Sequence, residues 1–409
     1  MVTGAPSGTP IHDVLIVGGG LVGASLAISL DALALDVGMV EATPAGALPA
    51  VFDQRNLSFA EATVNALDAL GVLPLLRAPA GPIRRIHISR AGDFGRVKLD
   101  AAAHGREAFG RVVVARDFGE ALEARLLQLK HLTRYRPARF IGLGDADAAH
   151  RIIRIADDNG ERQIGARLVV AADGSRSAVR DALGINAHEH DYAQTLFVTR
   201  LRTQRAPDGT AYERLTDHGP TALLPRGDGH YGLVHGVPRD EADAVAALDD
   251  DAFLARVQHA FGWRAGRFLA VGPRSAYPIV GCMADALTAS RGVVVGNAAQ
   301  SLHPLGAQGF NLGLRDALTL AECIEAASDP GDAAMLARYA ARRSDDRSRT
   351  LAFSDGLAKL TSNDAPLLRP LRSAGLVAGD AMGWLQGWLV GGAMGYRGDV
   401  PALCRKAAA

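Results

Sequence analysis

The chain has few of the residues that build covalent or metal-based scaffolds. It contains three cysteines among 409 residues, Cys282, Cys323 and Cys404, which lie far apart and show no paired spacing. This pattern argues against a disulfide framework and against a zinc site, and it is typical of proteins from a reducing compartment. We therefore expect no bound metal.

The chain also lacks an excess of charge. Lys plus Arg and Asp plus Glu each number 44, and no basic run or basic-aromatic face is present. A nucleic-acid partner is therefore not expected. The first twelve residues lack the basic start and apolar core of a signal peptide, which predicts a cytoplasmic protein.

Long apolar runs are missing as well. The uncharged segment 14–30 is too short to span a bilayer, and three consecutive glycines interrupt it. A strand, a tight turn and a helix explain it better. Residues 13–17 form a buried-strand pattern, and residues 21–35 a helical one.

The turn between these two elements carries a nucleotide-binding pattern. Gly18, Gly20 and Gly23 have GxGxxG spacing, and a second apolar strand, 37–40, ends at Glu41. A carboxylate at this position accepts hydrogen bonds from an adenosine ribose in Rossmann-type units. The pattern predicts dinucleotide binding but does not separate NAD from FAD.

A second polar turn follows another apolar strand. Residues 168–172 lead into Asp173 and Gly174, and a helix pattern opens in 175–180. Upstream, 151–168 alternates around an Asp-Asn-Gly hairpin signal. A nicotinamide dehydrogenase would instead continue with further βαβ units. Taken singly, Asp173 could also be the cap of the helix that follows.

The stretch 296–316 is the third polar turn. It follows a buried-strand pattern at 292–295 and precedes a helical run, 312–326. A glycine-rich loop at a helix N-terminus suits the ribityl chain and the electron-rich end of an isoalloxazine. An ordinary Gly/Pro loop is the alternative. The residues that we expect to bind cofactor here are Asn297, Pro304, Gly306, Ala307, Gln308, Gly309 and Asn311.

In this order, the three motifs resemble those of the single-component FAD-dependent aromatic hydroxylases, the superfamily of para-hydroxybenzoate hydroxylase. The resemblance implies non-covalent FAD, with Asp173 and Gly174 near its pyrophosphate and the third motif on its ribityl chain. It also implies NAD(P)H as a transient reductant, since a second GxGxxG unit is absent. Arg55 matches an arginine near the flavin.

Arg116 matches an arginine that opens a helix beneath the FAD phosphates. Asp117 and Glu120 have capping-box spacing, which places Arg116 at a helix N-terminus, where phosphate binds. A surface arginine is the alternative for this residue.

Within the superfamily, the chain most resembles the ubiquinone-biosynthesis branch and its 2-octaprenyl-6-methoxyphenol hydroxylases. Asn297 stands where most members carry Asp, in the run Gly-Asn-Ala-Ala-Gln-Ser-Leu-His-Pro. The segments that also agree are 86–89, 213–220, 261–263, 274–278 and 339–343. Two departures are the order Gly306-Ala307, inverted from Ala-Gly, and His235 in place of an expected Trp of the pocket lining.

These observations predict an α/β (α+β) fold. A Rossmann-like FAD-binding domain is expected from residues 1–80, 107–188 and 286–330. A mostly antiparallel β-sheet substrate domain is expected from residues 81–106 and 189–285, inserted into the first. Residues 331–409 are expected to form a C-terminal helical tail.

The resemblance implies hydroxylation of a polyprenylated methoxyphenol ring in ubiquinone biosynthesis, by O2 and NAD(P)H-reduced FAD through a C4a-hydroperoxide. Such chemistry needs a dry pocket, whose walls we expect from the alternating segments 194–201 and 232–237. His303 and Tyr277 are the candidates for a base that ionises the phenol, and a structural role is the alternative for each.

Other functions are a hydroxylase of a smaller aromatic compound and a non-catalytic flavoprotein that scaffolds a biosynthetic complex with other ubiquinone-biosynthesis proteins. Flavin halogenases are disfavoured, because the WxWxIP pattern is absent from the sequence.

The C-terminal segment 381–396 raises the question of membrane contact. It is uncharged, it is expected to place Trp384, Leu385, Trp388 and Leu389 on one helical face, and glycine recurs at every fourth residue from 383 to 395. It is too short to span a bilayer. We expect a helix packed on the body of the protein, and weak peripheral contact with the inner membrane as the sharper alternative.

Overall fold

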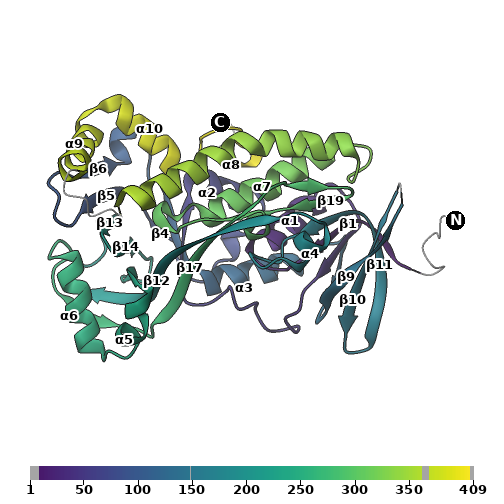
Figure 1. The fold of residues 1–409 in the computed structure, drawn as a ribbon, viewed down its shortest axis with the longest axis horizontal. Coiled ribbons are helices and arrows are strands. Elements are labelled where there is room, and N and C mark those ends of the chain that lie inside the picture. The colour runs from purple at the N-terminus through teal and green to yellow at the C-terminus, as the bar shows by residue number, and fades with distance from the viewer. Residues whose placement is uncertain (1–8, 148, 362–367, 406–409) are drawn as a thin grey trace.

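The computed structural model describes residues 9–147, 149–361 and 368–405, with the side chains of 307, 353–361 and 368–369 excepted. The chain folds around two large sheets that lie end to end along its long axis (Figure 1). The helices α7 (Gln308–Glu325) and α8 (Ala333–Thr361) run along this axis from one sheet toward the other.

The first sheet has eight strands and a parallel centre in the order β19-β11-β1-β2-β8. The centre of the sheet is buried, with Val14, Leu15 and Ile16 of β1 without exposed surface. Helices cover both faces of a parallel sheet, which explains why the runs Val14–Val17 of β1 and Leu168–Ala171 of β11 are apolar. Its strands are β1 (Ile11–Val17), β2 (Val37–Val40), β8 (Leu132–Tyr135), β9 (Arg139–Ala146), β10 (Arg151–Asp157), β11 (Gly160–Ala171), β18 (Thr288–Ala289) and β19 (Gly292–Val294).

The second sheet has nine strands and is antiparallel except for the β13–β5 pair. One of its faces packs on α6 (Asp250–Phe261) through a cluster that includes Phe197, Leu223 and Phe253. Its strands are β5 (Arg85–Arg90), β6 (Val97–Asp100), β12 (Ala187–Thr203), β13 (Thr210–Thr216), β14 (Gly219–Pro225), β15 (Tyr231–Pro238), β16 (Phe268–Val271), β17 (Ser275–Ala284) and β20 (Gln300–Ser301).

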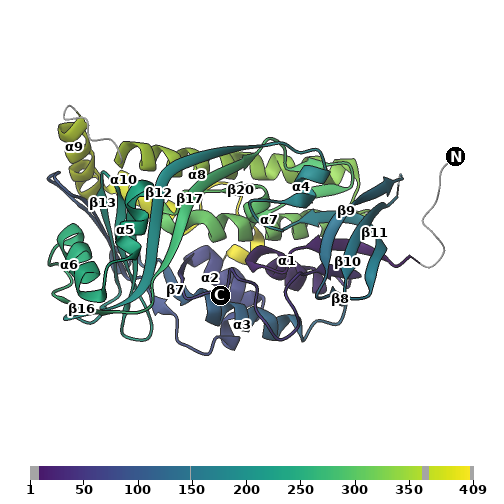
Figure 2. The ribbon, with the colours of Figure 1, turned by 60° about the horizontal axis from the view of Figure 1, so that its bottom comes forward.

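A small sheet and several helices connect the two large sheets. The small sheet pairs β7 (Gly110–Val114) with β3 (Asn56–Ala60) and β4 (Gly81–Pro82). The remaining helices are α1 (Leu21–Asp31), α2 (Glu61–Ala69), α3 (Ala115–Leu126), α4 (Ala178–Ala182), α5 (Ala242–Ala246), α9 (Leu368–Ala381) and α10 (Gly383–Ala393). Figure 2 shows α2 and α3 on the opposite side of the molecule from α8 and α9.

The predicted fold class is confirmed: a Rossmann-like sheet, a mostly antiparallel second sheet and C-terminal helices are all present. The expected domain ranges include residues 1–8, 362–367 and 406–409, which lie outside the described residues. The division into domains stays a prediction. Several element ends differ. The first helix ends at Asp31, and α7 begins at Gln308 rather than near 312. Among the described residues, no helix has both the length and the apolar character needed to cross a membrane.

The helices α7 and α8, the loop after β19 and strand β20 meet at a buried ion network. Asp316 of α7 accepts hydrogen bonds from Arg343 Nε of α8 (2.7 Å), Gln300 Nε2 (2.6 Å) and the backbone N–H of Gly296 (3.1 Å). Arg343 also pairs with Asp346 at 2.8 Å, and both side chains are buried. Although burial opposes its charged form, the two carboxylates raise the pKa of Arg343.

Removing one partner of such a buried network leaves an uncompensated charge. We predict that Asp316→Ala lowers the free energy of unfolding by about 3–5 kcal/mol, measured by chemical denaturation of the holoprotein. The control is Asp345→Ala, which breaks an exposed pair with Arg349 and should cost about 0–1 kcal/mol. Equal losses in the two variants would contradict the prediction.

Candidate cofactor and substrate site

The glycine turn after β1 is shaped by contacts within the chain. Gly18 has a φ of +109°, and a Cβ on it would lie 2.4 Å from the carbonyl oxygen of Ala172. A Cβ on Gly23 would lie 2.0 Å from the carbonyl oxygen of Gly18. These two glycines therefore let β1, its turn and α1 pack closely, whatever binds beside them.

Glu41 lies beside the same turn. Its Oε2 accepts a hydrogen bond from the backbone N–H of Gly19 at 2.8 Å, and its Oε1 accepts one from that of Thr43 at 2.7 Å. The carboxylate thus holds the glycine turn in place. Each carboxylate oxygen can accept a second hydrogen bond, so these contacts leave Glu41 able to accept one from a ribose hydroxyl.

Asp173 and Gly174 adjoin this turn, because Ala172 donates its backbone N–H to Val17 at 2.9 Å. Asp173 accepts hydrogen bonds from Ser177 Oγ and from the backbone N–H of Val179, and burial raises its pKa. The N-cap of α4 is Ser177, whose Oγ accepts the N–H of Arg180 at 2.9 Å, and not Asp173. Asp173 holds this cap in place through its bonds to Ser177 and Val179. It does so at the same edge of the first sheet as Glu41.

The third motif forms two short 3-10 turns before α7. The first spans Gly296–Ala298, where Gly296 has a φ of +59° and Asn297 is exposed. The second spans Leu305–Ala307 after Pro304, and its Gly306 has a φ of +72°. Gln308, the first residue of α7, donates its side-chain amide to the carbonyl oxygen of Gly306 at 3.0 Å.

Asn311 fastens this helix start to the small sheet. Its Oδ1 accepts hydrogen bonds from Ala60 N (2.9 Å) and Thr63 Oγ1 (2.7 Å), and its Nδ2 donates to the carbonyl oxygen of Ser58 (3.0 Å). Asn311 is buried. In this structure it positions the backbone of the loop.

Four other glycines test whether the chain fits a large flat cofactor. A Cβ on Gly174, Gly306 or Gly309 would meet nothing within 4 Å, and one on Gly20 would meet only Val51, at 3.8 Å. Gly174 and Gly306 need a positive φ, whereas Gly20 and Gly309 have neither a positive φ nor a close neighbour. Packing within the chain therefore does not require glycine at these two positions, but close approach of a dinucleotide does. The residues present fit FAD.

Arg55 is held by an acid that the sequence analysis did not single out. Its guanidinium forms a two-point ion pair with Asp53, at 2.9 Å from Oδ1 and 2.8 Å from Oδ2. It also lies over the ring of Tyr277 at 4.3 Å, and Tyr277 donates its hydroxyl to Asp53. Burial and this hydrogen bond raise the pKa of Tyr277. In this arrangement Tyr277 is a hydrogen-bond donor that joins β17 to the loop after β2.

Arg116 lies in the first turn of α3, and its guanidinium is exposed. The expected capping box is wrong. The helix begins at Ala115 with Val114 at its N-cap, so Asp117 and Glu120 fall inside it and cap nothing. The N-terminal position that was predicted for Arg116 holds for a different reason, since Ala115 and Arg116 donate their N–H groups to the carbonyl oxygens of Arg55 and Asp53, at 2.9 Å each.

His303 is buried at the base of the third motif. Its Nδ1 accepts a hydrogen bond from the backbone N–H of Leu305 (3.2 Å), and its Nε2 lies 3.0 Å from Oε1 of Gln194 on β12. Burial lowers the pKa of His303 to about 4. The neutral ring therefore bridges the loop and the second sheet through both of its nitrogens.

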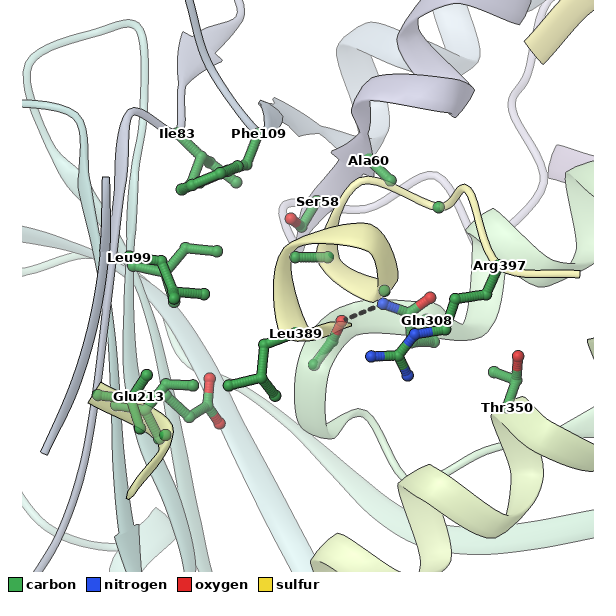
Figure 3. A pocket seen from close by; sticks show the side chains of 18 of the residues that line it. Ser58, Ala60, Ile83, Leu99, Phe109, Glu213, Gln308, Thr350, Leu389 and Arg397 are labelled. Carbon is green, nitrogen blue, oxygen red and sulfur yellow. Dashed lines mark hydrogen bonds between the residues drawn. The ribbon is translucent and has the colours of Figure 1, made fainter. Parts of the chain in front are cut away.

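A cavity of about 500 Å³ lies beyond this loop, between the second sheet and the C-terminal helices (Figure 3). One wall is made of apolar residues of β5 and β6, the facing wall of residues of α9 and α10, and the floor of Gly306 and Gln308. The apolar wall residues are Ile86, Ile88, Val97, Leu99, Leu215, Leu376, Leu385 and Leu389. The expected walls, 194–201 and 232–237, are wrong, because β12 and β15 pack on α6 instead.

The C-terminal helix also differs from expectation. Leu385 and Leu389 line the cavity, whereas Trp384 and Trp388 are exposed, so the four do not share one face. A Cβ on Gly383, Gly387 or Gly391 would meet no neighbour within 4 Å, so these three glycines of the stripe make no close helix contact, whereas a Cβ on Gly395 would lie 3.2 Å from the Cβ of Ala62. His235 is buried against Thr221, 2.9 Å from its hydroxyl, and does not line the cavity. Its replacement of Trp therefore does not change the pocket wall.

Known proteins resemble this chain in sequence and in fold. Residues 12–354 match the family model described as FAD binding domain. The chain is 35% identical over 400 residues to ubiquinone hydroxylase UbiL of Rhodospirillum rubrum, covering 96% of this chain and 91% of that protein. It is 30% identical over 387 residues to 3-demethoxyubiquinol 3-hydroxylase of Escherichia coli, covering 91% of this chain and 96% of the relative.

Among solved structures, p-nitrophenol 4-monooxygenase PnpA from Pseudomonas putida superposes with a TM-score of 0.77 at 19% identity, covering 95% of this chain and 99% of that chain. This likeness concerns the fold.

A substitution at Gly309 should change protein stability and cofactor affinity in opposite directions. We predict that Gly309→Ala raises the free energy of unfolding of the apoprotein by about 0.5 kcal/mol, because alanine favours a helix, and weakens FAD affinity, because the methyl group occupies the approach to the loop. FAD titration of the apoprotein measures the second effect.

Gly313 in the same helix is the matched control. A Cβ there would lie 2.8 Å from Val22 Cγ2 and 3.1 Å from Gly296 Cα, so Gly313→Ala should destabilise the apoprotein. Unchanged FAD affinity in Gly309→Ala would remove this glycine from the cofactor site.

Proposed function

Because the chain belongs to the FAD binding domain family and is an FAD-dependent aromatic monooxygenase, we propose that it hydroxylates a polyprenylated methoxyphenol ring in ubiquinone biosynthesis. The observation that carries this proposal is the apolar cavity that adjoins the Gly306–Gln308 loop. Its volume of about 500 Å³ lies in the usual range for small-molecule sites. The relatives in Rhodospirillum and Escherichia are named as a ubiquinone hydroxylase and a demethoxyubiquinol hydroxylase, which supports hydroxylation of a ring in ubiquinone biosynthesis.

We assign the cofactor contacts to residues of the three polar turns and to two arginines beside them. These residues are Gly18, Gly20, Gly23, Glu41, Arg55, Arg116, Asp173, Gly174, Asn297, Pro304, Gly306, Ala307, Gln308, Gly309 and Asn311. FAD, when bound and reduced by NAD(P)H, would supply the activation of O2, one atom of which passes to the ring. The residues of this chain orient the ring and exclude water. The leucine and isoleucine walls do the second, and a dry site protects the oxygen-transfer step from wasteful release of peroxide.

The proposed division of labour follows the two sheets. Residues 1–80, 107–188 and 286–330 serve FAD, residues 81–106 and 189–285 serve the substrate, and residues after 331 close the cavity. NAD(P)H docks transiently near Asp173 and Arg180. Arg180 is buried and donates to the carbonyl oxygens of Ser175 and Ala298, at 2.9 and 3.3 Å, so it supports this edge from within.

Activity measurements on the purified holoenzyme test the function. We expect NAD(P)H oxidation to be stimulated by a prenylated methoxyphenol, with one hydroxyl added to the ring and detected by mass spectrometry. Faster turnover of a tail-less phenol than of every prenylated one would favour a smaller aromatic substrate. No phenol-dependent oxidation with any ring compound would favour a non-catalytic scaffold and sink the proposal.

The helices α9 and α10, which cover one side of the cavity and are called the lid below, are the surface that we propose contacts the membrane. Exposed apolar side chains gather on α9 and α10, and they are Leu371, Val377, Met382, Trp384 and Trp388. Leu385 and Leu389 of the same α10 line the cavity beneath. A peripheral position at the inner membrane would place the lid where a polyprenyl substrate resides, and indoles favour the bilayer interface.

Replacing both lid tryptophans by alanine should reduce binding to phospholipid vesicles about tenfold, because less apolar area is buried in the interface. Cosedimentation with phosphatidylcholine–phosphatidylglycerol vesicles measures this. Trp263 is the control: it is 68% exposed, like Trp384 at 73%, but follows α6. Vesicle binding that falls equally in Trp263→Ala, or does not fall in the double variant, would exclude the lid as the membrane-facing surface.

A further inference from the structure

One carboxylate stands on the apolar wall of the cavity. Glu213 lies in the middle of β13, where its backbone pairs with Ile88 of β5 and with Ala222 of β14. Its side chain lines the cavity together with those of Ile88 and Leu215. In Figure 3 its carboxylate points from the sheet toward Leu389 of α10, with Gln308 on the far side of the cavity.

Glu213 has no partner among the residues that the structure describes: neither a hydrogen bond nor an ion pair engages its carboxylate. An ionisable group in such surroundings is costly to the folded state. An ionisable side chain on an otherwise apolar cavity wall is unfavourable for packing, and such exceptions are concentrated at functional sites. The carboxylate is therefore available to a ligand.

The arginines that line the cavity are each engaged by a residue other than Glu213. Five arginines line the cavity, one each from β5, α7, α8 and α9 and one that follows α10. Their partners are Asp93 and Asp217 for Arg90, Asp346 for Arg315, Asp345 for Arg349, Asp93 for Arg372, and the ring of Trp388 for Arg397. Burial alone raises the pKa of Glu213 to about 7.

We propose that Glu213 is the catalytic residue that accepts the proton of the substrate's phenol hydroxyl. This inference rests on the proposed function and names a group that His303 and Tyr277 do not provide, since both are engaged in hydrogen bonds outside the cavity. The ring hydroxyl donates its hydrogen bond to a Glu213 oxygen, which sends electron density into the ring and makes the reacting carbon more nucleophilic.

The step balances with the co-reactants already named. The phenol proton passes to Glu213, and an electron pair of the ring forms the new bond from carbon to oxygen as the O–O bond derived from O2 breaks. The ring carbon then loses its own proton to the second oxygen atom, and the ring oxygen of the phenol recovers a proton from Glu213. Overall, a C–H bond becomes C–OH, NAD(P)H supplies two electrons and a hydrogen, solvent supplies one proton, and the second atom of O2 leaves as water. An acceptor with a pKa near 7 takes a phenol proton with less cost than an ordinary glutamate.

The test uses the holoenzyme with a prenylated methoxyphenol and compares the wild type with Glu213→Gln, Glu213→Asp and the control Glu161→Gln, which changes an exposed glutamate of β11 outside the cavity. We expect wild-type hydroxylation to rise with pH around a midpoint near 7. Glu213→Gln should lower it about 100-fold and abolish that midpoint. Phenol-stimulated NAD(P)H oxidation should persist and yield hydrogen peroxide, while Glu213→Asp restores part of the rate and the pH dependence. Glu161→Gln should keep the wild-type profile.

A stability measurement separates this role from a structural one. Since burial raises the pKa of Glu213 in the folded state, the stability that it contributes is present below its ordinary pKa and is lost as pH rises through 7. Glu213→Gln should therefore unfold at higher denaturant than the wild type at pH 8, and not at pH 5. A less stable variant at pH 8, or an unchanged hydroxylation profile, would overturn the assignment. Absence of wild-type hydroxylation would instead defeat the proposed function.

Discussion

The buried carboxylate of Asp316 joins three parts of the molecule that lie far apart in the sequence. It receives the N–H of Gly296 from the loop that follows the first sheet, Gln300 from a strand of the second sheet, and Arg343 from the long helix above both. Each of these contacts is out of water, where a charge needs its partners. The relative placement of the two sheets, and so of cofactor loop and substrate cavity, depends on this group.

The backbone turns of the proposed cofactor site could be predicted because their requirements are local. A strand that turns at Gly18, a helix that starts behind it and an acid at Glu41 are neighbours in sequence, and their spacing is set by backbone geometry. The same holds for Gly306, whose φ of +72° favours glycine. Asp53 was missed because its role depends on Tyr277, a partner 224 residues away.

The cavity could not be predicted for the same reason. Its wall arises where β13 pairs in parallel with β5, which brings Glu213 beside Ile88. The hydrophobic periodicity of β5 and β13 does not indicate that these two strands pair. The alternating segment 194–201 has a pattern that is equally typical of a cavity wall. The structural contacts of Asp173 and His303 do not conflict with a place beside the proposed cofactor site, because a loop that binds a ligand must itself be held in shape.

The size of the cavity has a consequence for what the enzyme discriminates. A volume of about 500 Å³ accommodates a substituted ring and the start of its side chain, so under the proposed function most of a long isoprenoid tail remains outside, along the lid. Contacts with the sheet then select the ring and its oxidation state, while the number of isoprene units goes unmeasured. Such a catalyst would serve quinones of different chain lengths without any change to its active site, and tail length would be decided by whichever enzyme builds the tail.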